Sequence, residues 1–155
     1  MATIRKVGVL LAAVLLGGCL PIELEVSSDG RVLIPRQEGF FTLDGNGKVV
    51  RVYKPESGQP VFGRFVAGDK QIVAVTETGS GGGEQTFELV TLADGKARKL
   101  GETDKATYVT ISPDGKTLAF TRVSDESTDL GNDNKESLPE LHLLDLEKGQ
   151  EQKVK

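Results

Sequence analysis

YVTISPDGKTLAFTRV, residues 108–123, has the pattern of two β-strands joined by a tight turn. On each side of the turn, apolar residues alternate with small or polar ones, which is the period-2 pattern of a half-buried strand. The turn is formed by Ser112, Pro113, Asp114 and Gly115. Proline presets φ at the first central position, aspartate bonds its own backbone, and glycine tolerates a left-handed conformation. The stretch therefore predicts an antiparallel hairpin.

The residues that follow predict two further strands in the same sheet. Within the returning strand, Leu118 and Phe120 are expected to face one side and the residues between them the other. After a polar insert come ELHLLDL (140–146) and, beyond an EKG turn, the polar QEQKV (150–154). Four strands in up-and-down order, with the polar one outermost, are typical of a β-propeller blade.

Two segments of this unit, SPDGKTLAF (112–120) and LHLLDLEKGQ (141–150), resemble the repeat of TolB-type propellers and of the propeller domains of prolyl oligopeptidases. The resemblance implies a propeller fold and says little about function, because one fold serves many unrelated functions. In prolyl oligopeptidases the catalytic serine lies in a separate α/β-hydrolase domain. The G-x-S-x-G segment of that domain does not occur in this sequence.

Two looser copies of the unit precede it. The three copies span approximately residues 22–55, 60–101 and 106–155. SSDGR repeats the turn in the first copy through Asp29 and Gly30, whereas the second copy has lost this form. The basic residues after the three turns recur at intervals close to the ~40–45 residues of propeller repeats; they are Arg31, Lys70 and Lys116. We therefore predict that residues 22–155 form an all-β domain, with three four-stranded antiparallel blades of a partial β-propeller.

Three blades are fewer than the roughly four to eight with which propellers close. The first and last blades then each have one face without a neighbour, and large exposed apolar patches mark interaction sites or aggregation-prone surfaces. We expect either a segment of a longer protein or a chain that completes itself by oligomerising. The apolar residues expected on the open faces are Val32, Ile34, Phe41, Leu118, Phe120, Leu141 and Leu143.

The chain begins with the pattern of a bacterial lipoprotein leader. Arg5 and Lys6 form a positive n-region, and the apolar run 7–16 is shorter than the ~20 residues of a membrane-spanning helix. The next segment resembles a lipobox, made of Leu16, Gly17, Gly18 and Cys19. This resemblance implies a signal peptide over 1–18, expected as a helix, and a lipidated N-terminus with a short linker at 19–21. The alternative is an ordinary secretory peptide with an incidental cysteine.

Charge and cysteine content limit the expected partners. The net charge is −4, and loss of the leader removes two cations. An acidic chain lacks the clustered cations that bind nucleic acid or anionic lipid, so acyl chains on Cys19 are the predicted membrane anchor. Cys19 is the only cysteine, which excludes an internal disulfide. In enteric-type lipoproteins, an aspartate directly after the lipidated cysteine resembles a signal for retention in the inner membrane. This chain has Leu20 at that position. This favours the outer membrane, facing the periplasm, over the extracytoplasmic face of the plasma membrane.

Two loops are expected between the second and third strands of their copies. The glycine run Gly79–Gly83 lacks the Gly-Lys-Ser/Thr and the helix of a P-loop, so we interpret it as a flexible hairpin loop. The insert 124–137 carries five carboxylates, the type of ligand that binds calcium, but their spacing does not fit a calcium loop and Lys135 lies among them. We interpret it as a solvated, mobile loop. Both are candidate recognition loops, because loops on a rigid scaffold carry function.

Two residues within strands lead to specific expectations. Pro35 cannot donate to a ladder, so a bulge is expected in the second strand of the first copy. His142, the only histidine, alternates with Leu141 and Leu143 and is expected at the surface. Without a second histidine or another cysteine, the sequence supports neither a zinc site nor a histidine-based catalytic triad.

The sequence thus predicts a protein without enzymatic activity, cofactor or metal. The favoured function is a membrane-tethered propeller module of the bacterial cell envelope that binds another envelope protein or itself. The alternative is the N-terminal propeller portion of a longer exported hydrolase of the prolyl oligopeptidase type.

Overall fold

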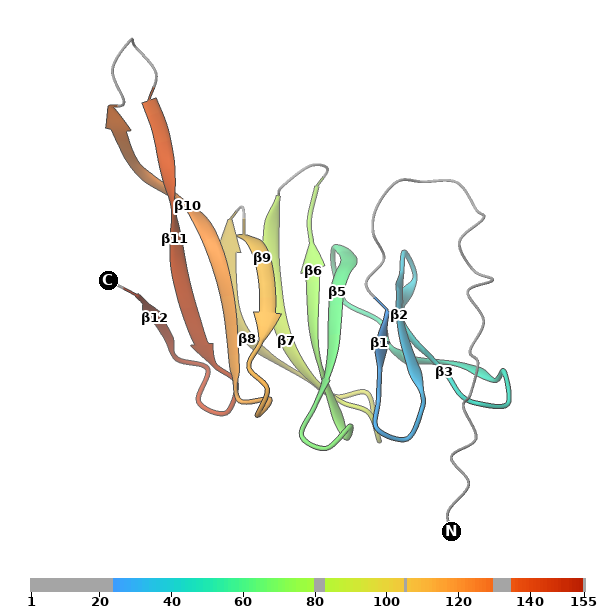
Figure 1. The fold of residues 1–155 in the computed structure, drawn as a ribbon. Helices are drawn as coiled ribbons and strands as arrows, with labels where there is room; N and C mark the ends of the chain where they lie inside the picture. The colour runs from blue at the N-terminus through green and yellow to red at the C-terminus, as the bar shows by residue number, and fades with distance from the viewer. Residues whose placement is uncertain (1–23, 80–82, 105, 130–134, 155) are drawn as a thin grey trace.

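The computed structural model describes residues 24–79, 83–104, 106–129 and 135–154, which form three four-stranded antiparallel sheets, here called blades 1, 2 and 3 (Figure 1). Blade 1 consists of β1 (Glu25–Val26), β2 (Val32–Arg36), β3 (Gly39–Leu43) and β4 (Val49–Tyr53). Blade 2 consists of β5 (Gln59–Val66), β6 (Gln71–Glu77), β7 (Glu84–Thr91) and β8 (Ala97–Asp104). Blade 3 consists of β9 (Ala106–Ile111), β10 (Thr117–Asp129), β11 (Lys135–Asp145) and β12 (Glu151–Lys153).

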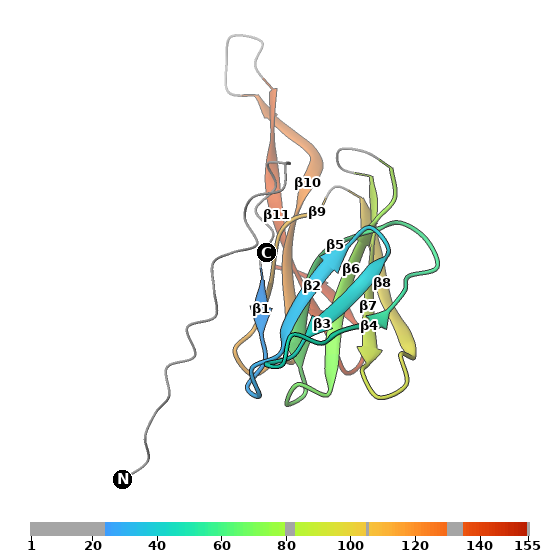
Figure 2. The ribbon, with the colours of Figure 1, turned by 90° about the vertical axis from the view of Figure 1, so that its right-hand side faces the viewer.

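Each strand is hydrogen-bonded to its neighbour in the chain, so every blade is an up-and-down meander. The blades lie side by side in chain order with blade 2 in the middle (Figure 1). In Figure 2 the last strands β4 and β8 lie on the opposite side of the molecule from the first strands β1 and β9. The predicted all-β fold of three four-stranded blades is confirmed.

The predicted leader lies outside the described residues, as do its expected helix and the lipobox with Cys19. Within the part of the chain that is described, no helix has the length and apolar character needed to cross a membrane.

Strand β6 is the centre of the hydrophobic core. Its five residues from Ile72 to Thr76 are all buried, although side chains in a strand alternate between the two faces of a sheet. Ile72 and Ala74 pack in a cluster with residues of blade 1, and Val73 and Val75 pack in a cluster with residues of blade 3. A sheet buried on both faces is expected to have such a continuous apolar run rather than a clean alternation.

Blades 1 and 2 meet through aromatic and aliphatic side chains that leave no space for a Cβ at Gly63. A Cβ on this β5 residue would lie 2.9 Å from Phe40 Cε1 and 3.0 Å from Leu33 Cδ2. Leu33 and Phe40 are both fully buried. At the outer edge of this interface, the Tyr53 hydroxyl donates to Glu88 Oε2 at 2.8 Å, and burial raises the pKa of Tyr53. The glycine thus permits close packing of the two sheets.

Blades 2 and 3 meet through a larger cluster that contains Phe87 and Phe120, whose ring centroids are 4.9 Å apart. Leu118 and Phe120 face the same side and are fully buried, which confirms the predicted strand phase. The side they face is blade 2, so the expectation that they lie on an open face is wrong. Arg98 of β8 spans the same interface and donates from Nη2 to the carbonyl oxygen of Leu146 at 2.7 Å.

The bulge expected at Pro35 is absent from the described pairing of β2. Pro35 pairs with Phe40 without a register shift, and the shift in blade 1 lies between Phe40 and Phe41, where β3 pairs with β4. The pairing of β2 with β1 is limited to Val32 and Leu33, so Pro35 lies beyond that ladder.

The described ends of the insert, up to Asp129 and from Lys135, continue the β10–β11 ladder instead of forming a loop. After a register shift beyond Val123, pairing resumes at Ser127 and extends to the pair Asp129–Lys135. Backbone groups make these ladder bonds, so a polar sequence extends the hairpin without apolar side chains.

Gly63 provides a test of the blade packing. We expect Gly63→Ala to lower the free energy of unfolding by about 1–3 kcal/mol, the usual penalty for overpacking a core. Gly101 of β8 is the matched control, because it is also a strand glycine and a Cβ there meets nothing within 4 Å. Urea unfolding of both variants measures the difference. Equal midpoints for Gly63→Ala and Gly101→Ala would show that blades 1 and 2 are not in close contact.

Candidate binding groove between the first strands of blades 2 and 3

The predicted turn residues Ser112 to Gly115 form the β9–β10 turn. The Gly115 N–H donates to the Ser112 carbonyl oxygen at 2.8 Å, and Gly115 has a positive φ of 70°. The Ser112 hydroxyl donates to the Asp114 carboxylate and accepts from the Thr117 N–H at 3.0 Å. The hydrogen bond from Ser112 is the largest cause that lowers the pKa of Asp114. These side chains are used to close the turn.

The turn around Asp29 and Gly30 in blade 1 repeats this arrangement. The Ser27 hydroxyl donates to Asp29 and accepts from the Arg31 N–H at 2.8 Å. Arg31 Nε lies 2.9 Å from each carboxylate oxygen of Asp29. Chiefly through this bond from Arg31, and then through Ser27, the pKa of Asp29 falls to about 2.

The corresponding turn of blade 2 has a different backbone, with positive φ at Ala67, Gly68 and Asp69. Asp69 Oδ2 accepts hydrogen bonds from the backbone N–H and the hydroxyl of Ser28. Arg31 Nη2 donates to the Asp69 carbonyl oxygen at 3.0 Å. The first turns lie at the same end of the molecule (Figure 1), and those of blades 1 and 2 are bonded to each other. The turn residues predicted from sequence are therefore structural.

His142 is 2% exposed, so its predicted surface position is wrong. Its ring stacks on Phe120 at a centroid distance of 5.4 Å, and Nδ1 lies 2.6 Å from Glu151 Oε1. The other ring nitrogen, Nε2, lies 3.4 Å from Glu140 Oε2. The histidine faces blade 2 together with Leu144. Its described neighbours are carboxylates and a phenyl ring, which fit a buried polar link better than a catalytic base.

A groove of about 610 Å³ lies beside the first strands of blades 2 and 3. Its lining residues come from β5, β7 and β9 and combine apolar, aromatic and polar side chains. They are Val61, Phe62, Arg64, Gln85, Tyr108, Val109 and Thr110. Val61 is 46% exposed, so the apolar wall is open to solvent.

Tyr108 forms one wall of the groove in a strained backbone conformation. Its φ is +52°, and its side chain is 88% exposed. The residue lies where the β9–β10 register shifts between Ala119 and Thr121. Positive φ at a bulky residue is rare and destabilises a protein by about 1–3 kcal/mol. The ring is thus held out from the sheet at an energetic cost, with no burial of the ring to offset it.

Gln85 lines the groove and carries a buried polar atom. Its side-chain Nε2 donates to the Ala106 carbonyl oxygen at 3.1 Å and to Glu77 Oε2 at 3.3 Å. Both partners are acceptors, which fixes the orientation of the amide. Its Oε1 is buried and accepts no hydrogen bond from any described residue. An unsatisfied buried acceptor costs about 1–3 kcal/mol, which a donor from a ligand or a water would relieve.

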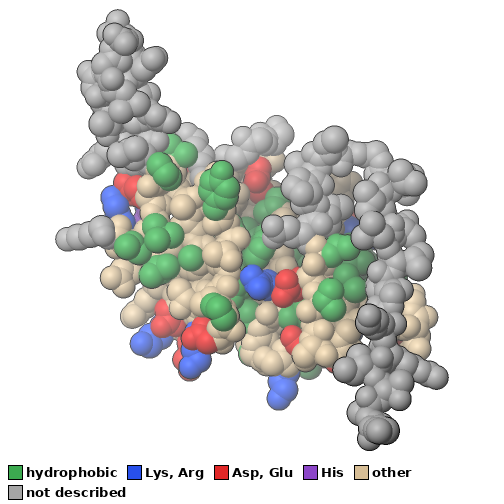
Figure 3. Space-filling view, viewed as in Figure 1, with side chains coloured by type: hydrophobic (Ala, Val, Ile, Leu, Met, Phe, Trp, Pro, Cys, Tyr) green, Lys and Arg blue, Asp and Glu red, His purple; other side chains and the backbone are tan. Residues whose placement is uncertain are grey.

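An ion pair borders the groove on the side of blade 1. Arg64 Nε lies 3.3 Å from Glu25 Oε1 of β1, and both side chains are partly exposed. Such exposed pairs contribute little to stability because water screens them. Figure 3 shows the face on which these first strands lie, with apolar side chains gathered over blade 3 and, separately, near β1.

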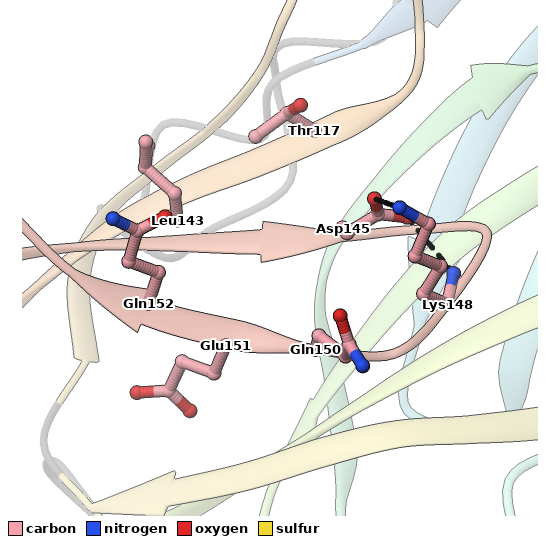
Figure 4. A pocket seen from close by; sticks show the side chains of 7 residues that line it. All are labelled: Thr117, Leu143, Asp145, Lys148, Gln150, Glu151 and Gln152. Atoms are coloured by element: carbon pink, nitrogen blue, oxygen red, sulfur yellow. Dashed lines mark hydrogen bonds and ion pairs between the residues drawn. The ribbon is translucent and has the colours of Figure 1, made fainter.

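A second hollow, of about 640 Å³, lies on the outward side of blade 3. Leu143 and Gln152 point to one side of the sheet, where Thr117 also lies, and Glu151 points to the other side (Figure 4). Asp145 Oδ1 accepts from the backbone N–H groups of Glu147 and Lys148. No group of three or more histidine, cysteine, aspartate or glutamate side chains suited to a metal ion occurs among the described residues.

The sequence analysis missed the groove, although one signal for it was present. Gln85 occupies the strand phase of Phe87 and Leu89, which pack in or against the core. A polar residue in an apolar phase marks a position where a buried hydrogen-bonding group needs a partner. The positive φ of Tyr108 depends on a register shift between two strands, which the local sequence does not show.

Several solved structures are similar to these three blades. The hydrazine synthase of Kuenenia stuttgartiensis matches 84% of this chain and 41% of its own, with a TM-score of 0.64 and 17% identity. TolB from Acinetobacter baumannii matches 85% of this chain and 31% of its own, with a TM-score of 0.62 and 16% identity. The chain has the fold of part of a β-propeller. The acylaminoacyl peptidase of Pyrococcus horikoshii matches 85% of this chain and 25% of its own, with a TM-score of 0.53 and 10% identity.

This partial propeller spans less than half the length of each of these structures. No protein-family model and no curated protein matches its sequence. Identities this low relate the chain to these proteins by fold, so its function has to be argued from its own residues.

The strain at Tyr108 can be measured by comparing alanine and glycine at this position. We expect Tyr108→Gly to be more stable than Tyr108→Ala by about 1 kcal/mol, because glycine alone adopts positive φ without strain. At Thr110, in the same strand with no positive φ, alanine should be the more stable of the two. Denaturant unfolding of the four variants supplies the comparison. The same order at both positions would contradict the strained conformation.

The Asp29 turn predicts a defined pH response. A carboxyl with a lowered pKa stabilises the folded state at neutral pH, and this contribution is lost as the pH falls from about 4 to about 2. In Arg31→Gln the pKa of Asp29 should rise toward the ordinary aspartate value of 3.8, because its main hydrogen-bond donor is gone. Carboxyl-carbon NMR titration measures this shift. Asp114 is the internal control, since Ser112 and Lys116 lower its pKa. An unchanged Asp29 titration in Arg31→Gln would contradict the assigned cause.

Proposed function

We propose that this chain is a non-enzymatic, membrane-tethered binding module of the bacterial cell envelope. Its binding site is the groove beside β5 and β9, and its ligand is a protein segment. The observation that carries the proposal is the buried Oε1 of Gln85, which has no donor among the described residues, together with the strained and exposed Tyr108 in the same lining.

Binding rather than catalysis is supported by the chemistry of the groove. The seven lining residues include no histidine, cysteine or carboxylate, and the only ionisable side chains are Arg64 and Tyr108. A nucleophile activated by an adjacent base therefore has no counterpart in this lining. An amide acceptor in an apolar and aromatic groove is instead typical of a recognition site, where few polar groups orient a ligand.

A protein segment matches this combination of groups. A peptide N–H is a donor of the kind that Gln85 Oε1 needs, and an apolar side chain beside it would bury Val61 and Phe62. Tyrosine is enriched at binding sites because it supplies a large contact area and loses little conformational entropy. The proposed attachment to a membrane of the cell envelope is supported by the lipobox pattern at Leu16–Cys19.

A second candidate is the propeller portion of a longer exported hydrolase. The match to an acylaminoacyl peptidase favours it, although the chain covers a quarter of that structure. A fluorophosphonate probe, which labels active serine hydrolases, separates the two in cells that express the natural gene. If the chain is a binding module, the protein that an antibody against blade 3 detects should not be labelled by the probe. Labelling of that protein would establish the hydrolase.

The membrane anchor is tested by Cys19→Ser. We expect this variant to move from the membrane pellet to the soluble fraction, because the acidic chain offers no other attraction to lipid. Metabolic labelling with a fatty acid should mark the wild-type chain and not the variant. Persistent labelling of Cys19→Ser would show that the lipid is attached elsewhere or that the leader is of another type.

Groove binding is tested by photo-crosslinking in cells. A photoreactive benzoyl-phenylalanine that replaces Tyr108 should form a discrete adduct with one envelope protein. Val61→Glu places a charge in the groove and should reduce this adduct by roughly tenfold or more. Val50→Glu is the matched control, because Val50 is a similarly exposed valine, at 41%, outside the groove. Equal adduct yields in the two valine variants would contradict the groove as the binding site.

A further inference from the structure

We propose that two copies of this chain associate head to tail, with the outward face of blade 1 against the outward face of blade 3 of the other copy. The outward face of a terminal blade is the one turned away from blade 2. This inference does not depend on the groove or on the lipid anchor.

The two blade interfaces within the chain define what each face requires. Ile72 and Ala74, which blade 2 turns toward blade 1, are fully buried. Leu118 and Phe120, which blade 3 turns toward blade 2, are fully buried as well. We call the side of a blade that is directed at the preceding blade its leading face, and the opposite side its trailing face. In both interfaces the apolar leading face of one blade packs against the trailing face of the blade before it.

Blade 1 has a leading face of the same character without a blade against it. Strand register places Val26, Val32 and Leu43 on the side opposite to Leu33, which packs against blade 2. Val49 pairs with Leu43 and belongs to the same side. Val26 is 60% exposed and Val49 is 49% exposed, whereas the matching face of blades 2 and 3 is closed. Of the residues predicted for this patch, Val32 is buried, whereas Ile34 and Phe41 pair with each other on the same side and are half-buried.

Blade 3 has the complementary trailing face. Leu141 pairs with Thr121 and Leu143 pairs with Ala119, on the side opposite to Phe120 and Leu144. Leu141 is 42% exposed, and the hollow of about 640 Å³ beside Leu143 lies on this side (Figure 4). Small side chains and a hollow leave room for the valines of a leading face. The earlier expectation that Leu141 and Leu143 lie on an open face is thus met, and Leu118 and Phe120 are excluded from it.

Repetition of the same contact points to another blade as the occupant of each open face, and a second copy supplies such a blade. A leading face meets a trailing face in both interfaces of this chain, and a second copy supplies both at once. Contacts between unlike faces close into a ring when the rotation allows it. Two copies together bring six blades of the kind described, within the range of roughly four to eight at which propellers close. The predicted assembly is therefore a dimer with two identical contacts.

Co-purification of two differently tagged full-length chains from detergent-solubilised membranes tests this arrangement. Val49→Glu disables the leading face of blade 1, and Leu141→Glu disables the trailing face of blade 3. Each residue is exposed in the single chain, so both variants are expected to fold, which circular dichroism checks. Val50→Glu is the control, because Val50 neighbours Val49 in β4 and belongs to the other side of the sheet.

The head-to-tail contact predicts a specific pattern of recovery. Wild-type pairs and Val50→Glu pairs should co-purify, and Val49→Glu pairs and Leu141→Glu pairs should fall by roughly tenfold or more. The mixed pair of Val49→Glu with Leu141→Glu should co-purify, because one intact contact remains. Failure of the mixed pair, or co-purification of Leu141→Glu pairs, would overturn the proposal in favour of like faces meeting. Wild-type chains that do not co-purify would overturn it outright.

Discussion

The structure depends on the burial of both faces of the middle blade. Strand β6 has apolar side chains on both sides, so its sheet is stable only when a sheet covers each face. Blade 1 covers Ile72 and Ala74, and blade 3 covers Val73 and Val75. The close approach of blade 1 requires glycine at position 63, and the wider contact with blade 3 accommodates the Phe87–Phe120 pair. The same requirement, applied to the terminal blades, leaves one face of each without a partner.

Polar contacts between blades follow from this stacking. Once the sheets are stacked, their first turns lie at the same end of the molecule, and a side chain of one turn reaches the backbone of the next. Asp69 bonds Ser28 in this way, and Arg31 bonds both Asp29 and the Asp69 carbonyl oxygen. In the second turn, which lacks the Ser-Pro-Asp-Gly form, the Asp69 carboxylate accepts from Ser28 of the neighbouring turn.

The sequence was sufficient to predict the strands but not to predict which face of each strand is buried. Alternation predicted the phase of Leu118 and Phe120 correctly. Phase divides residues into two sets but does not say which set meets a neighbouring blade, so His142 was expected at the surface and Phe120 on an open face. The extension of the hairpin through Ser127 to Asp129 was missed because ladder pairing uses backbone groups, which do not require an apolar pattern in the sequence. The groove was missed because Tyr108 is strained by a register shift between two strands, which a single segment does not encode.

The two unfavourable features of the groove make different demands on what fills it. A water molecule with its hydrogen directed at Gln85 Oε1 would satisfy that oxygen, so the orphan acceptor alone requires only a donor. The positive φ of Tyr108 is not relieved by water, because it is a property of the backbone that persists whether the groove is filled or empty. Glycine at this position would remove the strain and also the ring. Folding alone does not account for an exposed ring at this position, and contact with a bound molecule, as proposed above, would account for it: tyrosine supplies a large contact area and loses little conformational entropy when it is buried.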